Sequence, residues 1–529
     1  MMTGAGLLGY LARDFDRSRL GTAQCRAPWR GAPSVEIHHS IGGIVALGAA
    51  QAAEHRHLAV GLHGRIDNLA DLARDVGIDP AQPCAVLGEV YLRYGDTFAS
   101  RLLGDFAILV LDERRETLLG VRDWVAARPL FWSQHDDVVA FGSEVKQVLA
   151  LLDRAYRLDE NTAEEYRTLG DLPATATFAR GVLAVAASGQ VLATVGKETQ
   201  QSTRPVHFEP LDLSMSEAAA LIRERLDTAV ERRMQGASRP AALISGGMDS
   251  TSVAAAAAAL AQCGRVAPLA AGIGLHFPDV PGTDETRYAQ DLAELWDIPW
   301  RPVTVSPHDL TTDPTALLLP HDGPVFPGVQ FFDRLFAEAQ RCGADLVLTG
   351  QQADVWQTQL GDELKLSVLR REWQSALSWA LHGVRRHPRG TVKSIAGTAK
   401  AVLRKETESA HFAGRISGYW IRTAHEFEER LGHYYGLRVE SPFVDRELAE
   451  ALVGLSPRLR SNHAGQKLPL RAAMSDRLPR SILKRMDKSF FDPVFVAGYG
   501  PAQQPRSTGH MVAEHYLAAW RCQVVHGPQ

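Results

Sequence analysis

One short string in this sequence combines residue types that suit phosphate binding: Ser245-Gly246-Gly247-Met248-Asp249-Ser250. Its two glycines allow a tight turn in which backbone N–H groups approach phosphate oxygens. A helix starting directly after them would add positive potential at its N-terminus. The two serines offer hydroxyl donors, and Asp249 would repel phosphate unless a cation lay between them, which makes it a candidate Mg²⁺ ligand. An ordinary glycine turn with a helix cap is the alternative, but the complete string after a buried strand favours a phosphate loop.

Alternating strands and helices must position this loop. Strands are predicted at 241–244, 269–275, 301–305 and 345–348, and helices at 217–233, 250–261, 284–295 and 331–341. This alternation predicts a parallel, doubly wound sheet. Ligands of such sheets bind at the carboxyl ends of the strands, where Ser245 and Thr349 are both placed. The chain beyond Leu360 is predicted to be mostly helical.

The first 200 residues have a different pattern. Short apolar runs bounded by glycine predict strands at 42–48, 58–62 and 138–143, and a hairpin joins 106–111 to 118–121. The polar stretch 201–213, which contains Pro205 and Pro210, is predicted to be a linker. Two domains, 1–200 and 214–529, are therefore expected.

Composition excludes several function classes. The 529 residues are 45% hydrophobic and 22% charged with a net charge of -4, so no global attraction to nucleic acid or membrane is implied. The five cysteines form no C-x-x-C pair, which indicates neither a zinc site nor a disulfide framework and fits a reducing cytoplasm. We expect no signal peptide and no membrane span, because no apolar run approaches ~18 residues.

The string at 245–250 matches the pyrophosphate loop of the N-type ATP pyrophosphatases. The wider chain resembles the asparagine synthetase family, which includes the β-lactam synthetases and the lasso peptide cyclases, over nearly its whole length. The matching segments are 63–68, 103–107, 128–131 and 141–146 in the first domain, and 245–250, 348–354, 441–445, 470–474 and 485–488 in the second. The resemblance implies an N-terminal Ntn-glutaminase-like αββα sandwich and a C-terminal ATP-pyrophosphatase domain (adenine nucleotide α-hydrolase-like) with a helical extension. It also implies an ATP-dependent ligase that uses Mg²⁺ and releases AMP and pyrophosphate while activating a carboxylate.

The resemblance assigns roles to particular residues. It places adenosine against the backbone near Leu243, Ala271 and Gly350. It makes Asp354 the second acid on the Mg²⁺ held by Asp249, with a helix cap as the alternative role. The sequence departs from the family pattern at 352–353, where Gln-Ala replaces small or glycine residues.

Lys488 matches the family lysine that contacts the phosphates and the acyl-adenylate. Attack on the α-phosphate builds negative charge, which a buried ammonium stabilises where water is excluded. A surface lysine is the ordinary alternative. Arg485, in the same block, is a candidate assistant.

The first domain lacks the glutaminase nucleophile. The family's glutaminase needs an N-terminal cysteine, whereas residue 2 is Met2 and the first cysteine is Cys25. The segment 65–68, Arg-Ile-Asp-Asn, also departs from the family pattern of an acid and a tyrosine before Asn. We therefore expect a scaffold, or a surface that helps to hold a peptide, and no release of ammonia.

An amine supplied by the substrate points to one of two branches. β-Lactam synthetases have a tyrosine at the position of Gln351, with a glutamate partner, and glutamine cannot act as a general base. Lasso peptide cyclases join an Asp or Glu side chain of a precursor peptide to the peptide's own N-terminal amine, and pre-folding of the peptide supplies proximity. The Arg-x-Asp-Lys-x-x-Phe form of the last block also resembles lasso cyclases. This branch implies a core peptide substrate and neighbouring leader peptidase and leader-recognition proteins.

Two other functions stay open. A stand-alone amide synthetase would use free ammonia on a small acid such as aspartate. An inactive scaffold would bind a partner through the segment 382–405, which contains seven Lys or Arg and no acid. A solvated helical face is the ordinary role of such a segment, and docking of an acidic partner or peptide is the functional one.

Overall fold

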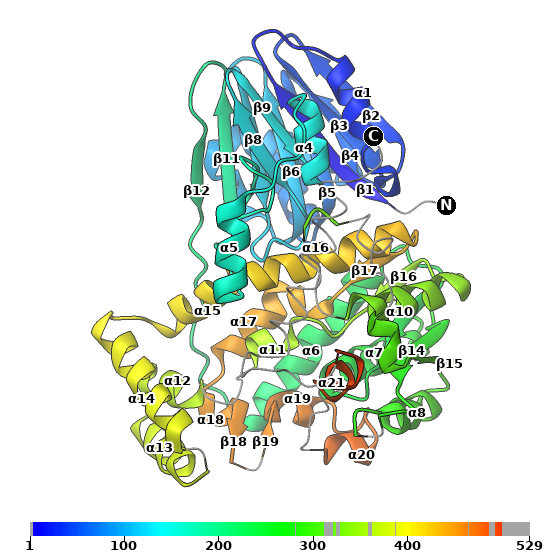
Figure 1. Cartoon of the computed structure of the whole chain (residues 1–529), viewed down its shortest axis with the longest axis vertical. Coiled ribbons are helices and arrows are strands. Elements are labelled where there is room, and N and C mark those ends of the chain that lie inside the picture. Colours follow the sequence, from blue (N-terminus) through cyan, green and yellow to red (C-terminus); the bar gives the residue numbers. More distant parts are fainter. Residues whose placement is uncertain are drawn as a thin grey trace.

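The computed structural model describes residues 4–280, 282–311, 321–323, 328–357, 362–386, 388–463, 465–485 and 492–499. Figure 1 shows two bodies, a β-rich first domain above and a mixed second domain below, with the long helix α16 (Tyr419–Tyr434) running between them.

Two stacked antiparallel sheets form the first domain. One has the strand order β10-β8-β9-β1-β3-β2, and the other has the order β12-β11-β7-β6-β5-β4. The strands are β1 (Ala5–Leu11), β2 (Pro33–His39), β3 (Gly42–Gly48), β4 (Gln51–His55), β5 (Leu58–Ile66), β6 (Gly104–Asp112), β7 (Thr117–Arg122), β8 (Phe131–His135), β9 (Val138–Gly142), β10 (Leu183–Ala184), β11 (Gly189–Thr194) and β12 (Gln200–Thr203).

Helices cover the outer faces of both sheets. The residues Leu7, Leu109 and Phe141 belong to the core between the sheets. Outside them pack α1 (Ser18–Gln24) and α4 (Val145–Leu151) on one sheet, and α2 (Leu69–Val76) and α3 (Pro83–Tyr94) on the other. The helix α5 (Glu160–Leu169) descends toward the second domain. This is the predicted αββα sandwich, and the predicted hairpin is β6 paired with β7.

The second domain is built on a parallel sheet of order β15-β14-β13-β16-β17. Its strands are β13 (Pro240–Leu243), β14 (Ala271–His276), β15 (Trp300–Thr304), β16 (Leu346–Leu348) and β17 (Arg438–Glu440). Helices α6 (Met215–Met234), α7 (Met248–Gln262) and α8 (Thr286–Leu295) contribute to the core on one face. Helices α10 (Val329–Arg341) and α16 contribute to the core on the other, so the sheet is doubly wound as predicted.

The remainder of the second domain is mainly helical. It comprises α11 (Ala353–Trp356), α12 (Glu363–Leu369), α13 (Trp373–Arg386), α14 (Pro388–Leu403), α15 (Glu408–Ile416), α17 (Arg446–Gly454), α18 (Pro457–Arg460), α19 (Leu468–Ala473), α20 (Arg480–Leu483) and α21 (Asp492–Tyr499), with the small hairpin β18 (Ser461–Asn462) and β19 (Gly465–Gln466). Within the described ranges, no helix combines the length and the apolar character needed to cross a bilayer.

Candidate active site

The predicted phosphate loop joins β13 to α7. Gly246 has a φ of 73°, and a Cβ at this position would lie 2.9 Å from the Cβ of Tyr288, so the turn depends on glycine. Gly247 is the N-cap of α7. Ser250 accepts a hydrogen bond from the backbone N–H of Ser245 at 3.1 Å, and the two hydroxyls lie 2.9 Å apart. The loop therefore presents a glycine turn and serine hydroxyls at the start of a helix.

A second strand ends beside this loop. β13 and β16 are neighbours, and the chain leaves β13 toward β14 on one side and later enters β16 on the other. This is the switch point of a doubly wound sheet, where such folds bind ligands. Gly350, after β16, approaches α7 so closely that a Cβ there would lie 2.5 Å from the backbone nitrogen of Ser250.

The two predicted metal acids meet at one cation. Lys467 Nζ lies 2.7 Å from Asp354 Oδ1 and also contacts Asp249 Oδ2. Gln357 Nε2 donates to the other oxygen of Asp249 at 3.3 Å. Burial alone would lower the pKa of Lys467, but the two aspartates raise it above its usual value, so the ammonium stays charged.

This arrangement suits Mg²⁺. Two carboxylates that share one ammonium nitrogen lie close enough to share a small divalent cation. Mg²⁺ in nucleotide sites takes one or two carboxylates, with phosphate oxygens and water completing its coordination. Across the described part of the chain, no group of three or more His, Cys, Asp or Glu residues is arranged to hold a metal. The donor set thus fits a metal that arrives with a nucleotide better than a metal held by protein ligands alone.

Gln351 lies against a buried glutamate. Its side-chain amide, with the nitrogen facing Glu428, places that nitrogen 2.5 and 2.8 Å from the two carboxylate oxygens. Thr349 Oγ1 donates to the same carboxylate at 3.3 Å. Burial in α16 raises the pKa of Glu428 to about 8. A carboxyl that titrates near neutral pH therefore lies by the strand end that delivers Asp354.

The last predicted block is partly described. Arg485 is buried behind the loop, where its Nη1 donates to the carbonyl of Gly246 at 3.4 Å and its Nη2 pairs with Glu285 at 2.6 Å. Its guanidinium also lies 4.5 Å from the ring centre of Tyr288. Arg485 is therefore placed to hold the loop in position. Lys488 lies outside the described residues.

The predicted adenosine positions are not all brought together. Leu243 pairs with Ile273 at the end of the sheet that carries the loop, and Gly350 lies beside the loop. Ala271 is fully buried and pairs with Ala241 at the start of β14. It lies two residues before the level at which β13 ends and the loop begins, so it is not beside the loop. Ile273 is the β14 residue beside Leu243.

Sequence reasoning missed Lys467 and Glu428. Lys467 is held in the left-handed region at φ 58° before α19, three residues ahead of the matched block at 470–474. Glu428 lies on a helix where many residues are charged, and its sequence neighbours do not distinguish it. The resemblance to β-lactam synthetases implied a glutamate beside position 351, but the sequence did not show which glutamate that would be.

A buried ion network joins the two domains next to the site. Arg30 of the first domain pairs with Glu144 at 2.7 Å and with Glu429 of α16 at 2.8 Å. Glu429 also lies 3.0 Å from Nε2 of His63. Arg430 of the same helix pairs back to Glu144 at 2.7 Å. These side chains are nearly or completely buried.

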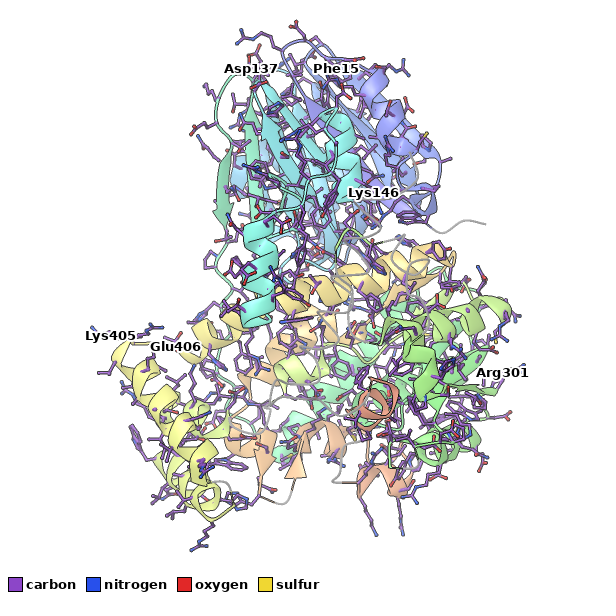
Figure 2. The ribbon with its side chains drawn as sticks, viewed as in Figure 1. Phe15, Asp137, Lys146, Arg301, Lys405 and Glu406 are labelled. Atoms are coloured by element: carbon purple, nitrogen blue, oxygen red, sulfur yellow. The ribbon has the colours of Figure 1, made fainter. Side chains whose placement is uncertain are left out.

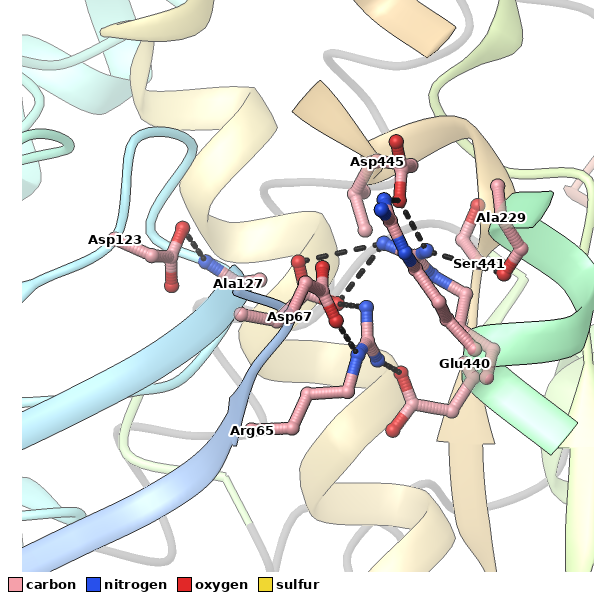
Figure 3. Close-up of polar contacts among 12 residues, drawn as sticks. Arg65, Asp67, Asp123, Ala127, Ala229, Glu440, Ser441 and Asp445 are labelled. Carbon is pink, nitrogen blue, oxygen red and sulfur yellow. Dashed lines mark hydrogen bonds and ion pairs between the residues drawn. The ribbon is translucent and has the colours of Figure 1, made fainter. Parts of the chain in front are cut away.

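A second part of the network is centred on Arg65. Its guanidinium contacts Asp105 at 2.8 Å, Asp67 at 2.7 Å and Glu440 of β17 at 3.2 Å. Figure 3 shows Arg65 between Asp67 and Glu440. Arg128 pairs with Glu440 at 2.5 Å. The segment 63–68, which matches the glutaminase domains, thus contributes side chains that bind the second domain.

Comparisons with known proteins agree with this architecture. The asparagine synthase family model matches residues 221–514, and the glutamine amidotransferase domain model matches residues 52–204. Asparagine synthetase [glutamine-hydrolyzing] 3 of Bacillus subtilis is 23% identical over 80% of this chain and 74% of its own length. Amidase chry2 of Gibberella zeae is 28% identical, over 35% of this chain and 27% of its own length.

A plant relative is also similar. The asparagine synthetase [glutamine-hydrolyzing] of Zea mays is 27% identical over 39% of this chain and 31% of its own length. Among solved structures, a glutamine PRPP amidotransferase of B. subtilis in complex with ADP and GMP is 11% identical and covers 65% of this chain and 81% of its own, but its TM-score of 0.28 supports no argument. The asparagine synthase model covers more than half of the 529 residues. The chain therefore belongs to the asparagine synthase family and is an ATP-dependent C–N ligase.

Proposed function

We propose that this ligase converts a carboxylate to its acyl-adenylate and closes a macrolactam in a peptide, the reaction of a lasso peptide cyclase. An Asp or Glu side chain of the peptide would supply the carboxylate, and the peptide's own N-terminal amine would attack it. The observation that carries the adenylation step is the meeting of Asp249 and Asp354 at one cation beside a glycine phosphate loop.

The loop and its neighbours bind and orient ATP. Backbone N–H groups at Gly246 and Gly247 and the N-terminus of α7 face the phosphates. Mg²⁺ held by Asp249 and Asp354 would neutralise phosphate charge and orient the nucleotide. Lys467 exchanges its carboxylate partners for phosphate oxygens and stabilises the departing pyrophosphate.

Glu428 takes the proton of the attacking amine. An N-terminal amine has an ordinary pKa of about 7.7–8.0, and burial raises the pKa of Glu428 to about 8. Proton transfer between groups of matched pKa is efficient. Gln351, which has no basic nitrogen, holds the carboxylate in place through its amide.

The first domain supports an amine that comes from the substrate. His63 and Arg65, in the segment that would read glutamine, are both engaged with second-domain glutamates. A pre-folded peptide brings its amine and carboxylate together, which replaces much of the cost of a bimolecular step. We also propose a leader peptidase and a leader-recognition protein as partners that would deliver such a peptide.

The reaction can be tested in two steps. Exchange of labelled pyrophosphate into ATP, dependent on a core peptide, would report adenylation. Mass spectrometry would then find a product lighter by one water. Release of ADP in place of AMP would overturn the adenylation chemistry, and peptide adenylation without ring closure would overturn the cyclase branch alone.

A small-molecule amide synthetase is the second candidate, favoured by the names of the relatives from B. subtilis and Zea mays. Pyrophosphate release with aspartate and ammonium in the absence of peptide would support it. An inactive scaffold is the third candidate, and the converged acids and Lys467 oppose it. Failure of the purified protein to bind Mg²⁺–ATP in calorimetry would favour the scaffold.

A further inference from the structure

Helices α13 and α14 form a hairpin that projects from the lower left of the second domain in Figure 1, packed against each other and against α12. The residues turned inward from these two helices are small or polar. They include Ser375, Ala376, Thr391 and Ala401, and Gly383 lies against Thr391. Apart from Trp379, which packs against His382 and His463, the large apolar side chains of the two helices lie on the outside, which reverses the usual order for a helix pair in water.

On α13 the exposed apolar residues form one stripe. The stripe consists of residues at helical spacing: Trp373, Leu377, Leu381 and Val384. The side chain of Trp373 is 63% exposed. Residues three or four apart lie on the same face of a helix, so these side chains are neighbours. An exposed stripe of this size marks a surface that something covers.

α14 has three distinct faces. Thr391, Thr398 and Ala401 are buried. Val392, Ile395, Val402 and Leu403 form an exposed apolar face, with Leu403 84% exposed.

The third face of α14 is basic and borders the apolar face. It carries four exposed cations, Arg389, Lys393, Lys400 and Arg404. Apolar stripes flanked by Lys and Arg are typical of helices that lie in a membrane interface.

The charge is of one sign throughout the hairpin. No Asp or Glu occurs from Trp373 to Lys405, whereas seven Lys or Arg do. Charge complementarity pairs such a cationic surface with an anionic one. Together with the flanking apolar stripes, this surface complements the anionic headgroups and apolar interior of a lipid bilayer.

We propose that the α13–α14 hairpin docks this enzyme on the surface of an anionic lipid bilayer, with its apolar stripes in the headgroup region and its cations on the lipid phosphates. The docking surface is separate from the ATP site and does not depend on which substrate the enzyme uses. Figure 2 shows Lys405, just beyond the end of α14, at the edge of the molecule opposite Arg301.

The test is flotation of the full-length protein with vesicles of phosphatidylcholine alone or mixed with phosphatidylglycerol. We expect binding to the anionic vesicles only. Each cation adds roughly fivefold to such partitioning, so K393E with K400E should weaken it by at least about 30-fold. L377S with L381S should weaken it without changing the charge.

R301E with K197E is the matched control, because both residues are exposed and lie away from the hairpin. This control should bind vesicles like the unmodified protein. Circular dichroism of each variant separates loss of docking from loss of folding. Absence of binding to anionic vesicles, or binding that neither hairpin variant weakens, would overturn the proposal. Self-association that the leucine variant abolishes, without vesicle binding, would assign the surface to a second copy instead.

Discussion

At the scale of single residues, the site depends on two ionisable side chains, the ammonium of Lys467 and the carboxyl of Glu428. Lys467 neutralises Asp249 and Asp354, which would otherwise repel each other in a partly buried site. The same ammonium is close to the phosphate loop. Glu428 has no such counter-charge among the groups that shift its pKa, so burial controls its titration.

The substitution K467M should reduce pyrophosphate exchange by about 10²–10³-fold, as loss of one transition-state donor does. ATP affinity should fall less, because the loop backbone is unchanged. The control is K365M, which removes a lysine paired with Glu406 at 2.7 Å in the helical extension. Near-full exchange in K467M would show that this lysine serves only the resting structure.

The substitution E428Q should separate the two half-reactions. Adenylation should persist, while amide formation slows by about 10²–10⁴-fold. In the unmodified enzyme, Glu428 is mostly protonated below its pKa of about 8, so amide formation should rise with pH and level off above 8. A rate profile in E428Q that kept this rise would assign the titration to another group, and E406Q serves as the remote control.

At the scale of elements, the strand–loop–helix unit places the phosphate donors, and close backbone packing fixes its shape. Gly246 faces Tyr288 in the first turn of α8 and Glu285 at its N-cap, while Gly350 packs against the first turn of α7. Gln352, the N-cap of α11, adopts φ 70°, a left-handed conformation that glycine adopts more easily. Loop geometry here comes from tertiary packing as well as from the local residues.

Two glycines offer a matched comparison. Gly246 and Gly264 have φ values of 73° and 69°, but a Cβ added at Gly246 would meet atoms within 4 Å, whereas one added at Gly264 would meet none. Alanine at either position should cost about 1 kcal/mol of folding stability from backbone strain. G246A alone should also weaken ATP binding, measured by calorimetry. Equal ATP affinity in both variants would contradict the close-packed loop.

The sequence was sufficient for the elements whose signals are local. The string 245–250 and the apolar run before it predicted β13, the loop and α7, and the apolar runs 106–111 and 118–121 predicted the β6–β7 hairpin. The strand β17 was not predicted, because it has only three residues, Arg438-Val439-Glu440. Two of them are charged, so the segment lacks the apolar run that marks a buried strand. Lys467 and Glu428 reach the site from segments far along the chain, and only tertiary packing brings them there.

At the scale of the whole molecule, buried ion pairs hold the domains together. Glu426, Glu429 and Arg430 on α16 all find partners in the first domain. A paired buried charge is roughly neutral for stability, whereas removal of one partner leaves an uncompensated charge. The interface therefore tolerates loss of single residues poorly.

The substitution E429Q should lower the free energy of unfolding by about 3–5 kcal/mol at pH 7, measured with urea, because Arg30 loses one of its two buried carboxylate partners. Burial alone would raise the pKa of Glu429, but Arg30 holds it well below its usual value. Its stabilising contribution is thus present above the ordinary carboxyl pKa of about 4.3 and is lost as pH falls below it. The difference between E429Q and the unmodified protein should shrink in acid, and E209Q, at an exposed site, should show no difference at either pH.

The ion network between the domains makes the first domain a structural requirement of the second. The carboxylates of Glu426, Glu429 and Glu440 depend on guanidinium groups supplied by Arg122, Arg30 and Arg65. The second domain needs these counter-ions whatever the source of the amine, so the first domain contributes to the folded structure of the whole chain. Divergence at this boundary has to proceed through compensated pairs, with an arginine and its glutamate changing together.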